Sequence, residues 1–143
     1  MRVALERTVM SPETYIEVCV SAGLSVPNIE AVQRGLPRSL YSVCAVDKLG
    51  RTLGFARVVG DGGVFFEIVD VAVRKECQGN GIGRTLMLDV LAWLEREAHP
   101  TAFVGLSANA GSSGFYKKLG FEPRSIDEPY MMHARWNRLE TRA

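Results

Sequence analysis

The sequence predicts a mixed α/β fold in which helices cover the faces of one mixed sheet. Segments with strand and helix patterns follow one another in the order β-α-α-β-β-β-α-β-α-β. The apolar run VFFEIVDVAV (64–73) leads into the glycine-rich loop ECQGNGIGRT (76–85) and then into an amphipathic helix pattern. The 143 residues contain no repeat, linker or low-complexity tract. We therefore expect a single domain over residues 1–143.

The amino-terminal part predicts one strand followed by two helices. MRVALER (1–7) has the pattern of a first strand. Ser11 is suited to cap a helix that has Pro12 as its first residue, and Gly23 is suited to end that helix. A second, shorter helix is expected over residues 28–35, between Pro27 and a glycine and proline stop.

The middle of the chain predicts three antiparallel strands. Residues 39–46 and 52–59 are rich in β-branched and aromatic side chains, and the turn DKLG joins them as a hairpin. The sequence GDGG at 60–63 then turns the chain into the strand at 64–73.

The last part predicts a long helix, a strand, a short helix and a closing strand. From Gly81 to about Pro100, apolar residues keep helical spacing on one face. TAFVGLSA (101–108) predicts another strand, and SSGFYKKLG (112–120) predicts a short helix. PYMMHARW (129–136) has the pattern of a last strand.

Composition excludes several classes of function. The chain has 17 basic and 16 acidic residues, a net charge of +1 and no basic run, so we expect neither a nucleic acid nor a membrane as partner. Three widely spaced cysteines predict no disulfide framework and indicate a reducing compartment. His99 and His133 lie far apart, so no metal site is expected. Without a signal-peptide or membrane-span pattern, the expected location is cytoplasmic.

The glycine loop predicts an anion site. Gly79, Gly81 and Gly83 leave consecutive amides uncovered at the start of a helix, an arrangement that suits a pyrophosphate. The dinucleotide pattern G-x-G-x-x-G is not met, because Arg84 stands where its third glycine should be. The Lys-Ser/Thr pair of a Walker loop is also missing. A tight turn between strand and helix, without any ligand, is the alternative.

Two segments resemble the GCN5-related N-acetyltransferase (GNAT) superfamily, whose members move an acetyl group from acetyl-CoA to an amine. Residues 69–95 match its acyl-CoA-binding motif. In this motif an Arg or Gln is followed by two residues, a Gly, one further residue, and then Gly or Ala. ANAGSSGFYKKLGFE (108–122) matches its next motif, in which an Asn precedes a short helix that bears Phe-Tyr and ends in Gly-Phe. Within the superfamily the chain is similar to the small, single-domain bacterial enzymes. The resemblance implies the GNAT fold, with a central, mostly antiparallel mixed sheet of six to seven strands, about four flanking helices, and a splay between the fourth and fifth strands.

The resemblance also implies which residues bind acetyl-CoA, the acyl donor. The loop amides would hold the pyrophosphate, the strand before them would pair with the pantetheine arm, and Asn109 would contact this arm. Tyr116 would protonate the departing thiolate, since a phenol with a pKa of about 10 is protonated at neutral pH. An Asx turn is the alternative for Asn109, and a plain core position is the alternative for Tyr116. The implied cofactor-binding residues are Val71, Ala72, Val73, Gln78, Gly79, Asn80, Gly81, Ile82, Gly83, Arg84, Asn109 and Tyr116.

Two carboxylates are candidates for the base that deprotonates the acceptor amine. Glu67 and Asp70 lie on the strand expected beside the acetyl group. Strict alternation would place them on opposite faces, but the superfamily has a bulge in this strand, which would bring them to one face. Asp70 could equally accept backbone hydrogen bonds in a structural role. The candidate catalytic residues are therefore Tyr116, Asp70 and Glu67.

The sequence leaves three functions open. The first is an N-acetyltransferase that moves an acetyl group from acetyl-CoA directly to a primary amine of a small molecule in a ternary complex. The second is a noncatalytic acyl-CoA sensor, and the third is acetylation of protein lysines or N-termini. A homodimer through the last strand is also open. Candidates for an apolar acceptor pocket are Phe65, Phe66, Tyr130, Met131 and Met132.

Overall fold

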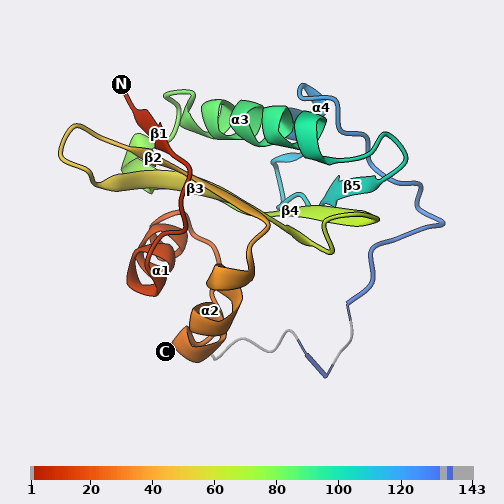
Figure 1. Ribbon diagram of the computed structural model, residues 1–143, viewed down its shortest axis with the longest axis horizontal. Helices are drawn as coiled ribbons and strands as arrows, with labels where there is room; N and C mark the ends of the chain where they lie inside the picture. Colours follow the sequence, from red (N-terminus) through yellow and green to blue (C-terminus); the bar gives the residue numbers. More distant parts are fainter. Residues whose placement is uncertain (1, 133–134, 137–143) are drawn as a thin grey trace.

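A central sheet lies between helices on its two faces (Figure 1). The structure is a computed structural model that describes residues 2–132 and 135–136. Helix α3 (Ile82–Glu97) crosses one face of the sheet, and helices α1 (Pro12–Ser21) and α2 (Ile29–Gly35) lie on the other side. This is the mixed α/β architecture that the order of patterns predicts.

The described residues form one sheet of five strands in the order β1-β2-β3-β4-β5. Neighbouring strands are antiparallel except β4 and β5, which run parallel because α3 connects them as a crossover. The predicted three-stranded antiparallel unit in the middle of the chain is confirmed. The strand bounds are Ala4–Glu6 for β1, Tyr41–Val46 for β2, Thr52–Gly60 for β3, Phe65–Val73 for β4 and Phe103–Leu106 for β5.

The described residues form fewer strands than the six to seven that the resemblance implied. The expected strand at 129–136 is wrong for its described part, because residues 129–132 and 135–136 pair with no strand, and residues 133–134 lie outside the described chain. The preceding segment turns where the Glu128 amide donates to the Ser125 carbonyl at 3.0 Å. Pro129 then offers no backbone N–H for a ladder. As a result, no described residue pairs with the outer edge of β5.

Side-chain caps begin the first two helices, at the predicted Ser11 and at Asn28, the first residue of the predicted second helix. The Ser11 hydroxyl accepts a hydrogen bond from the Thr14 amide at 3.2 Å, and the Asn28 side chain accepts one from the Glu30 amide at 2.9 Å. Gly23, with a φ of +79°, follows the end of α1, in line with its predicted role. Three shorter elements complete the chain: η1 (Leu36–Arg38), η2 (Lys75–Cys77) and α4 (Ser113–Lys117), the last shorter than the predicted 112–120.

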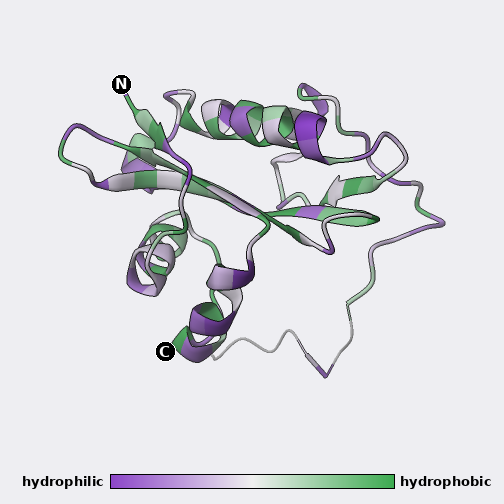
Figure 2. Cartoon of the chain, viewed as in Figure 1, coloured by the Kyte–Doolittle hydropathy of each residue, from purple (hydrophilic) through white to green (hydrophobic). Residues whose placement is uncertain are grey.

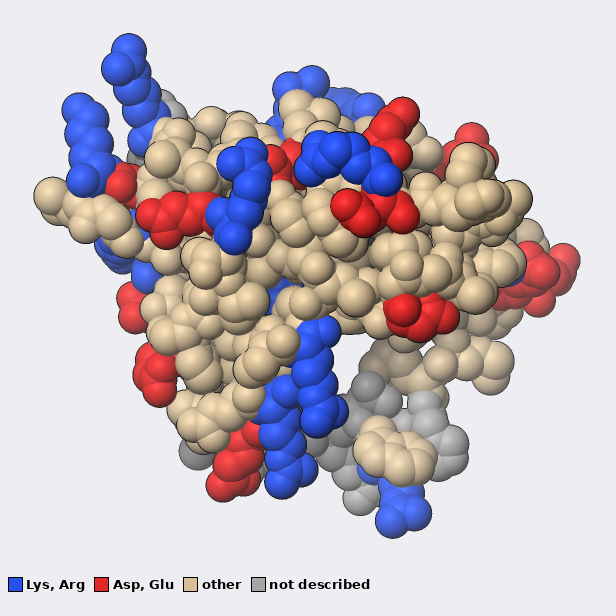
Figure 3. Space-filling model, viewed as in Figure 1, with Lys and Arg blue, Asp and Glu red and all other residues tan. Residues whose placement is uncertain are grey.

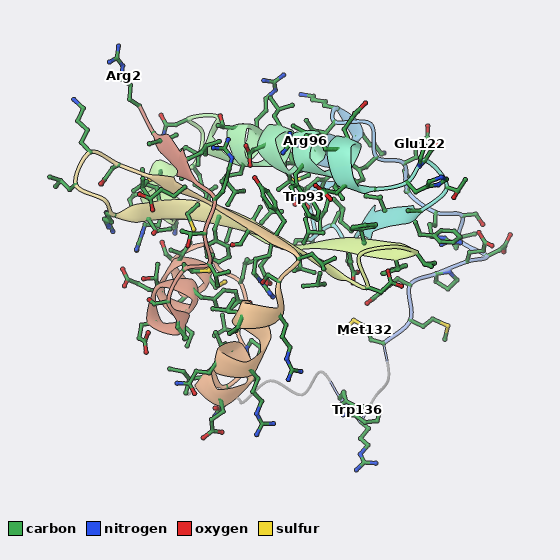
Figure 4. All side chains as sticks on the ribbon, in the orientation of Figure 1. Arg2, Trp93, Arg96, Glu122, Met132 and Trp136 are labelled. Atoms are coloured by element: carbon green, nitrogen blue, oxygen red, sulfur yellow. The ribbon has the colours of Figure 1, made fainter. Side chains whose placement is uncertain are left out.

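Two apolar cores hold the helices against the sheet. Under α3, the side chains of Leu86, Met87 and Val90 are fully buried against the strands. Figure 4 shows Trp93 on the same helix, and its ring stacks on Tyr41 with the ring centroids 4.8 Å apart. The second core lies between α1 and the other face of the sheet. In Figure 2 the hydrophobic colour follows the central strands, whereas the helices carry both colours, as expected of elements with one buried face.

Candidate active site

A cleft opens where β4 separates from β5. The two strands pair over residues 65–68 of β4 and all four residues of β5. The chain leaves the sheet after Leu106, so the later residues of β4 have no partner on this side within the described chain. A cleft of about 660 Å³ lies here, lined by β4, by the turn at 22–25 after α1, and by the segment that follows β5. The predicted splay between the fourth and fifth strands is therefore confirmed.

A β-bulge interrupts β4 beside this cleft. One residue of β3, Ala56, lies opposite two residues of β4, Asp70 and Val71. Asp70 takes up the extra length with a φ of +56°. In a regular strand, Glu67 and Asp70 would point to opposite faces, yet here both line the same cleft. The expected bulge, and the shared face that it would produce, are confirmed.

The end of β4 has backbone groups that face away from β3. The Arg74 amide donates to the Leu53 carbonyl at 2.8 Å across the β3–β4 ladder, so the backbone of the preceding residue, Val73, points to the open side. The Gln78 side chain donates to the Val73 carbonyl at 3.0 Å. Val71 and Val73 pack their side chains under α3, while Ala72 is buried on the opposite face. Their packing leaves the backbone of this stretch as the part that a ligand could reach.

Arg57 holds Asp70 in place. Its Nε and Nη2 donate to Oδ2 of Asp70 at 3.0 and 2.7 Å, and its Nη1 donates to the Ser39 hydroxyl at 2.9 Å. The guanidinium also lies 5.8 Å from the centre of the Tyr15 ring, on α1. Asp70 is thus ion-paired with Arg57, whose side chain is mostly buried. Arg57 was not predicted as a site residue, although it is the one charged residue inside the apolar run TLGFARVV (52–59), which is a signal for such a contact.

Glu67 lies at the end of the cleft where β4 still pairs with β5. Its side chain is half-buried and forms no hydrogen bond or ion pair with another residue between 2 and 132. Its partner in the β4–β5 ladder is Gly105, and a Cβ at that glycine would meet no atom within 4 Å. The carboxylate of Glu67 therefore has open space beside it, which Asp70 does not.

Tyr116 on α4 lines the same cleft as Glu67. Its ring packs edge-on against Phe115 and Phe121, at centroid distances of 5.0 and 6.1 Å. Burial raises the pKa of its phenol above the ordinary value of 10.0. The hydroxyl forms no hydrogen bond with the rest of the described chain. The phenol therefore stays protonated at neutral pH and keeps its proton for another partner.

Asn109 lies on the same side of the cleft, just before α4. Its backbone carbonyl accepts from the amide of Ser112 at 3.0 Å and from the hydroxyl of Ser112 at 2.7 Å. Within residues 2–132 its side chain makes no hydrogen bond, so the Asx turn considered from the sequence is not formed. The side-chain amide is exposed at the cleft.

The glycine loop presents free amides at the start of α3. Gly79 and Gly81 have φ values of +81° and +77°, which few other residues adopt, and a Cβ at either would meet no atom within 4 Å. From Gly79 to Arg84, no backbone amide donates a hydrogen bond to another residue within 2–132. Asn80 shapes the loop from inside, because its side chain donates to the Cys77 carbonyl at 3.0 Å. Ile82, Gly83 and Arg84 form the first turn of α3, with Ile82 buried and Arg84 exposed.

A second cleft, of about 580 Å³, shares its inner wall with the first. Glu67, Leu106, Ser107 and Tyr116 line both. The second cleft continues along β5 to the segment at 120–130, where Phe65, Phe103 and Tyr130 contribute aromatic rings. Two of the acceptor-pocket candidates, Phe65 and Tyr130, are therefore placed at this cleft.

The other acceptor-pocket candidates lie elsewhere. The prediction that Phe66 lines an acceptor pocket is wrong, because Phe66 is buried in the core beneath α3. Met131 and Met132 are exposed and do not line this cleft, and Figure 4 shows Met132 on the carboxy-terminal segment, away from the sheet. Phe103 and Gly105 were not predicted from the sequence, because only the β4–β5 register brings them beside Phe65 and Glu67.

Other parts of the described structure show fewer chemical features. No helix among the described residues is long and apolar enough to cross a membrane. Over the same residues, no group of three or more His, Cys, Asp or Glu side chains could hold a metal ion. In Figure 3, basic and acidic side chains are interspersed over the face in view.

Comparison with known proteins identifies relatives of this arrangement. The family model described as an acetyltransferase (GNAT) domain matches residues 37–123. A Staphylococcus aureus structure described as a probable acetyltransferase of unknown function is 33% identical, covering 92% of this chain and 98% of that one with a TM-score of 0.87. A GNAT-family acetyltransferase from Streptococcus pneumoniae is 25% identical, covering 96% of this chain and 98% of that one with a TM-score of 0.77.

A curated relative adds a named activity. Serotonin N-acetyltransferase 2, chloroplastic, from Oryza sativa subsp. japonica is 41% identical over 109 residues, or 73% of this chain. The matched region spans 53% of the rice protein, so the chain covers about half of that relative's length.

Proposed function

Because this chain belongs to the GNAT family of acetyltransferases, whose members use acetyl-CoA as donor, we propose that it acetylates a primary amine of a small molecule. The transfer is direct, with donor and acceptor bound together, and proximity of the two supplies most of the rate. One observation carries this proposal: the cleft at the β4–β5 separation has free carboxylate and phenol groups at its inner end, and the glycine loop follows β4 at its other side. Residues 1–143 would form one domain, and the three free, buried cysteines support a reducing compartment such as the cytoplasm.

The glycine loop is the proposed site for the pyrophosphate of acetyl-CoA. Support comes from its free amides, from the absence of any atom where a Cβ would stand at Gly79 and Gly81, and from the positive end of the α3 dipole. Arg84 adds a cation in the first turn of α3. The residues proposed to complete the donor site are Val71, Ala72, Val73, Gln78, Asn80, Ile82, Gly83, Asn109 and Tyr116.

Glu67 is the proposed base for the acceptor amine. With a pKa near 10.4, only about one amine in 2,500 is neutral at pH 7, a penalty of about 4.6 kcal/mol. A base that removes the proton within the cleft, directly or through a water, offsets this penalty. Glu67 has open space beside it, whereas both short contacts of Asp70 are made to Arg57. The geometry therefore favours Glu67 over Asp70.

Tyr116 is the proposed acid that gives its proton to the departing thiolate. The bound donor supplies a thioester, whose sulfur leaves as a thiolate. A buried phenol with a raised pKa is protonated throughout the neutral range, and its hydroxyl has no partner within residues 2–132 that would compete for the proton. Tyr116 also lies on the wall common to both clefts, between the proposed donor and acceptor sites.

The second cleft supports an acceptor amine that carries an aromatic group. Phe65 and Phe103 are ladder partners on one face, and 47% and 64% of their surfaces are exposed. Phe65 lies two positions before Glu67 on β4, a distance of about 6.6 Å along the strand. In an arylethylamine the nitrogen lies about 5 Å from the ring centre by ordinary bond lengths, so a ring on this floor would bring its amine to Glu67. The rice relative is named for serotonin, an arylethylamine, which supports the same class.

An acceptor screen with acetyl-CoA tests the proposal. We would measure thiol release and the mass of the acetylated product with 2-phenylethylamine, with spermidine and with a lysine-containing peptide. The proposal expects the aromatic amine to be preferred, Phe103→Ala to raise the KM for that amine, and Glu67→Gln to lower kcat at neutral pH. Glu95→Gln, on the exposed side of α3, is the matched control and should change nothing. CoA binding without thiol release from any amine would instead favour the sensor, and a preference for the peptide would favour a protein acceptor.

A further inference from the structure

We infer that Arg57 is a positioning residue, which holds the β4 bulge through Asp70 and so sets the shape of the cleft. The inference rests on the proposed function in one respect, that this cleft binds acetyl-CoA. It concerns a residue that makes no contact with either proposed substrate site, because Arg57 lines neither cleft.

The bulge needs an outside contact to be stable. Asp70 is the only non-glycine residue in the described chain with a positive φ, at +56°. That conformation is disfavoured for a residue with a Cβ, and it persists where surrounding contacts hold it. Two of those contacts come from one guanidinium, with N–O distances of 3.0 and 2.7 Å. The Tyr15 phenol also lies beside this carboxylate, and burial together with Asp70 raises the pKa of Tyr15. Both N–O contacts come from Arg57, so Arg57 is the charged group that holds Asp70.

The same guanidinium links the bulge to η1 and to α1. Its third nitrogen donates to the Ser39 hydroxyl at 2.9 Å, and that hydroxyl donates to the Leu36 carbonyl in η1 at 2.8 Å. Its plane lies over Tyr15 on α1, the helix that leads into the turn at 22–25. This turn lines the cleft across from β4. Arg57 therefore links the bulge to η1 and to α1, the helix that carries the other wall, and 12% of its side chain is exposed.

The geometry of arginine matters for this role. A guanidinium offers its donors in a fixed plane, so one side chain can bind a carboxylate with two nitrogens and a hydroxyl with the third. A lysine would keep the charge but could not make the three contacts at once. Loss of the planar group should let the bulge relax, which moves the backbone at Val71 and the carboxylate at Glu67 together.

Substitutions that break the clamp test this role. The variants are Arg57→Gln, Arg57→Lys, Asp70→Asn and the double variant Arg57→Gln/Asp70→Asn. We would measure CoA affinity by calorimetry, kcat and KM for both substrates, the pH–rate profile and the melting temperature. Arg51→Gln removes an exposed ion pair with Glu76 and is the matched control.

A positioning role predicts a specific pattern. Each single variant should weaken CoA binding by roughly tenfold or more, as misplacement of a binding group does. The double variant should be little worse than either single one, because both break the same contact. Arg57→Lys should resemble Arg57→Gln, the acidic limb of the pH–rate profile should keep its position in every variant, and Arg51→Gln should behave as wild type.

Other results would overturn the inference. If Asp70→Asn abolishes the acidic limb while CoA affinity is unchanged, Asp70 is the base. If Arg57→Gln binds CoA as tightly as wild type, the clamp does not shape the donor site, whereas a wild type that binds no CoA rejects the proposed function itself. Should Arg57→Gln fail to fold, Ser39→Ala removes the third contact alone. It should weaken CoA binding in the same direction by a smaller factor, and an unchanged affinity there would also count against the clamp.

Discussion

Replacing Tyr116 by phenylalanine should lower the rate of acetyl transfer while leaving the fold intact. The ring contacts with Phe115 and Phe121 do not involve the hydroxyl, and the hydroxyl has no hydrogen-bond partner within residues 2–132. The free energy of unfolding should therefore change by less than about 0.5 kcal/mol. General acid catalysis contributes roughly 10²–10⁴-fold, so kcat should fall by about that factor wherever protonation of the thiolate limits turnover.

Tyr41 provides the opposite control. Its hydroxyl donates to Asp89 at 2.5 Å, between β2 and α3 and outside both clefts. Tyr41→Phe should cost about 1.5–3 kcal/mol of stability, as loss of a hydrogen bond to a charged group does, and leave kcat unchanged. Thermal unfolding and single-turnover thiol release measure the two quantities on each variant. Equal rates for wild type and Tyr116→Phe over pH 6–9, with CoA still bound, would refute the assignment of Tyr116 as the acid.

Three further predictions concern the loop, the core and the thiols. Gly81→Ala should lower the free energy of unfolding by about 1–2 kcal/mol, because the φ of Gly81 is +77°. It should also raise the KM for acetyl-CoA in steady-state kinetics. An unchanged KM would count against the loop as donor site. Leu86→Ala should lower the free energy of unfolding by about 2–5 kcal/mol in urea titration, because Leu86 is fully buried under α3, and a loss under 1 kcal/mol would contradict this packing. Burial raises the pKa of Cys19 to about 12 and of Cys44 to about 11, from 9.0, so neither thiol should react with a thiol reagent in the folded protein at pH 8. The thiols of the unfolded chain ionise at a lower pH than those of the folded protein. The free energy of unfolding should therefore fall as the pH rises from 9 to about 12, and it should not depend on these two thiols below pH 9.

Local patterns predicted most elements of the fold but not their pairing. Ser11, Asn28 and Gly23 act within a few residues of their own helices, so the sequence carries their signals directly. The segment at 129–136 has the composition of a strand, but a strand needs a partner edge, and a proline at its start and a turn before it keep its described part from that edge. Pairing of this kind depends on distant residues, which periodicity does not report.

The candidate site shows the same division. The glycine loop and Tyr116 belong to contiguous motifs. The structure places Tyr116 at the cleft and the glycine loop between β4 and the start of α3. The bulge at Asp70 was expected from the resemblance. The role of Arg57 was not, because its contact with Asp70 depends on the pairing of β3 with β4. Phe66 was misjudged because the face of a strand residue depends on register, and its neighbour Phe65 takes the open side.

The contact between Gln78 and Val73 bears on how readily a bound molecule can depart. The free protein already satisfies this carbonyl with its own side chain, at 3.0 Å. A ligand that donates to the same oxygen replaces the hydrogen bond from Gln78 with its own. Such an exchange contributes little to the net free energy of binding. When this ligand dissociates, the side-chain amide of Gln78 can donate to the Val73 carbonyl again, so the carbonyl keeps a hydrogen-bond donor at each stage.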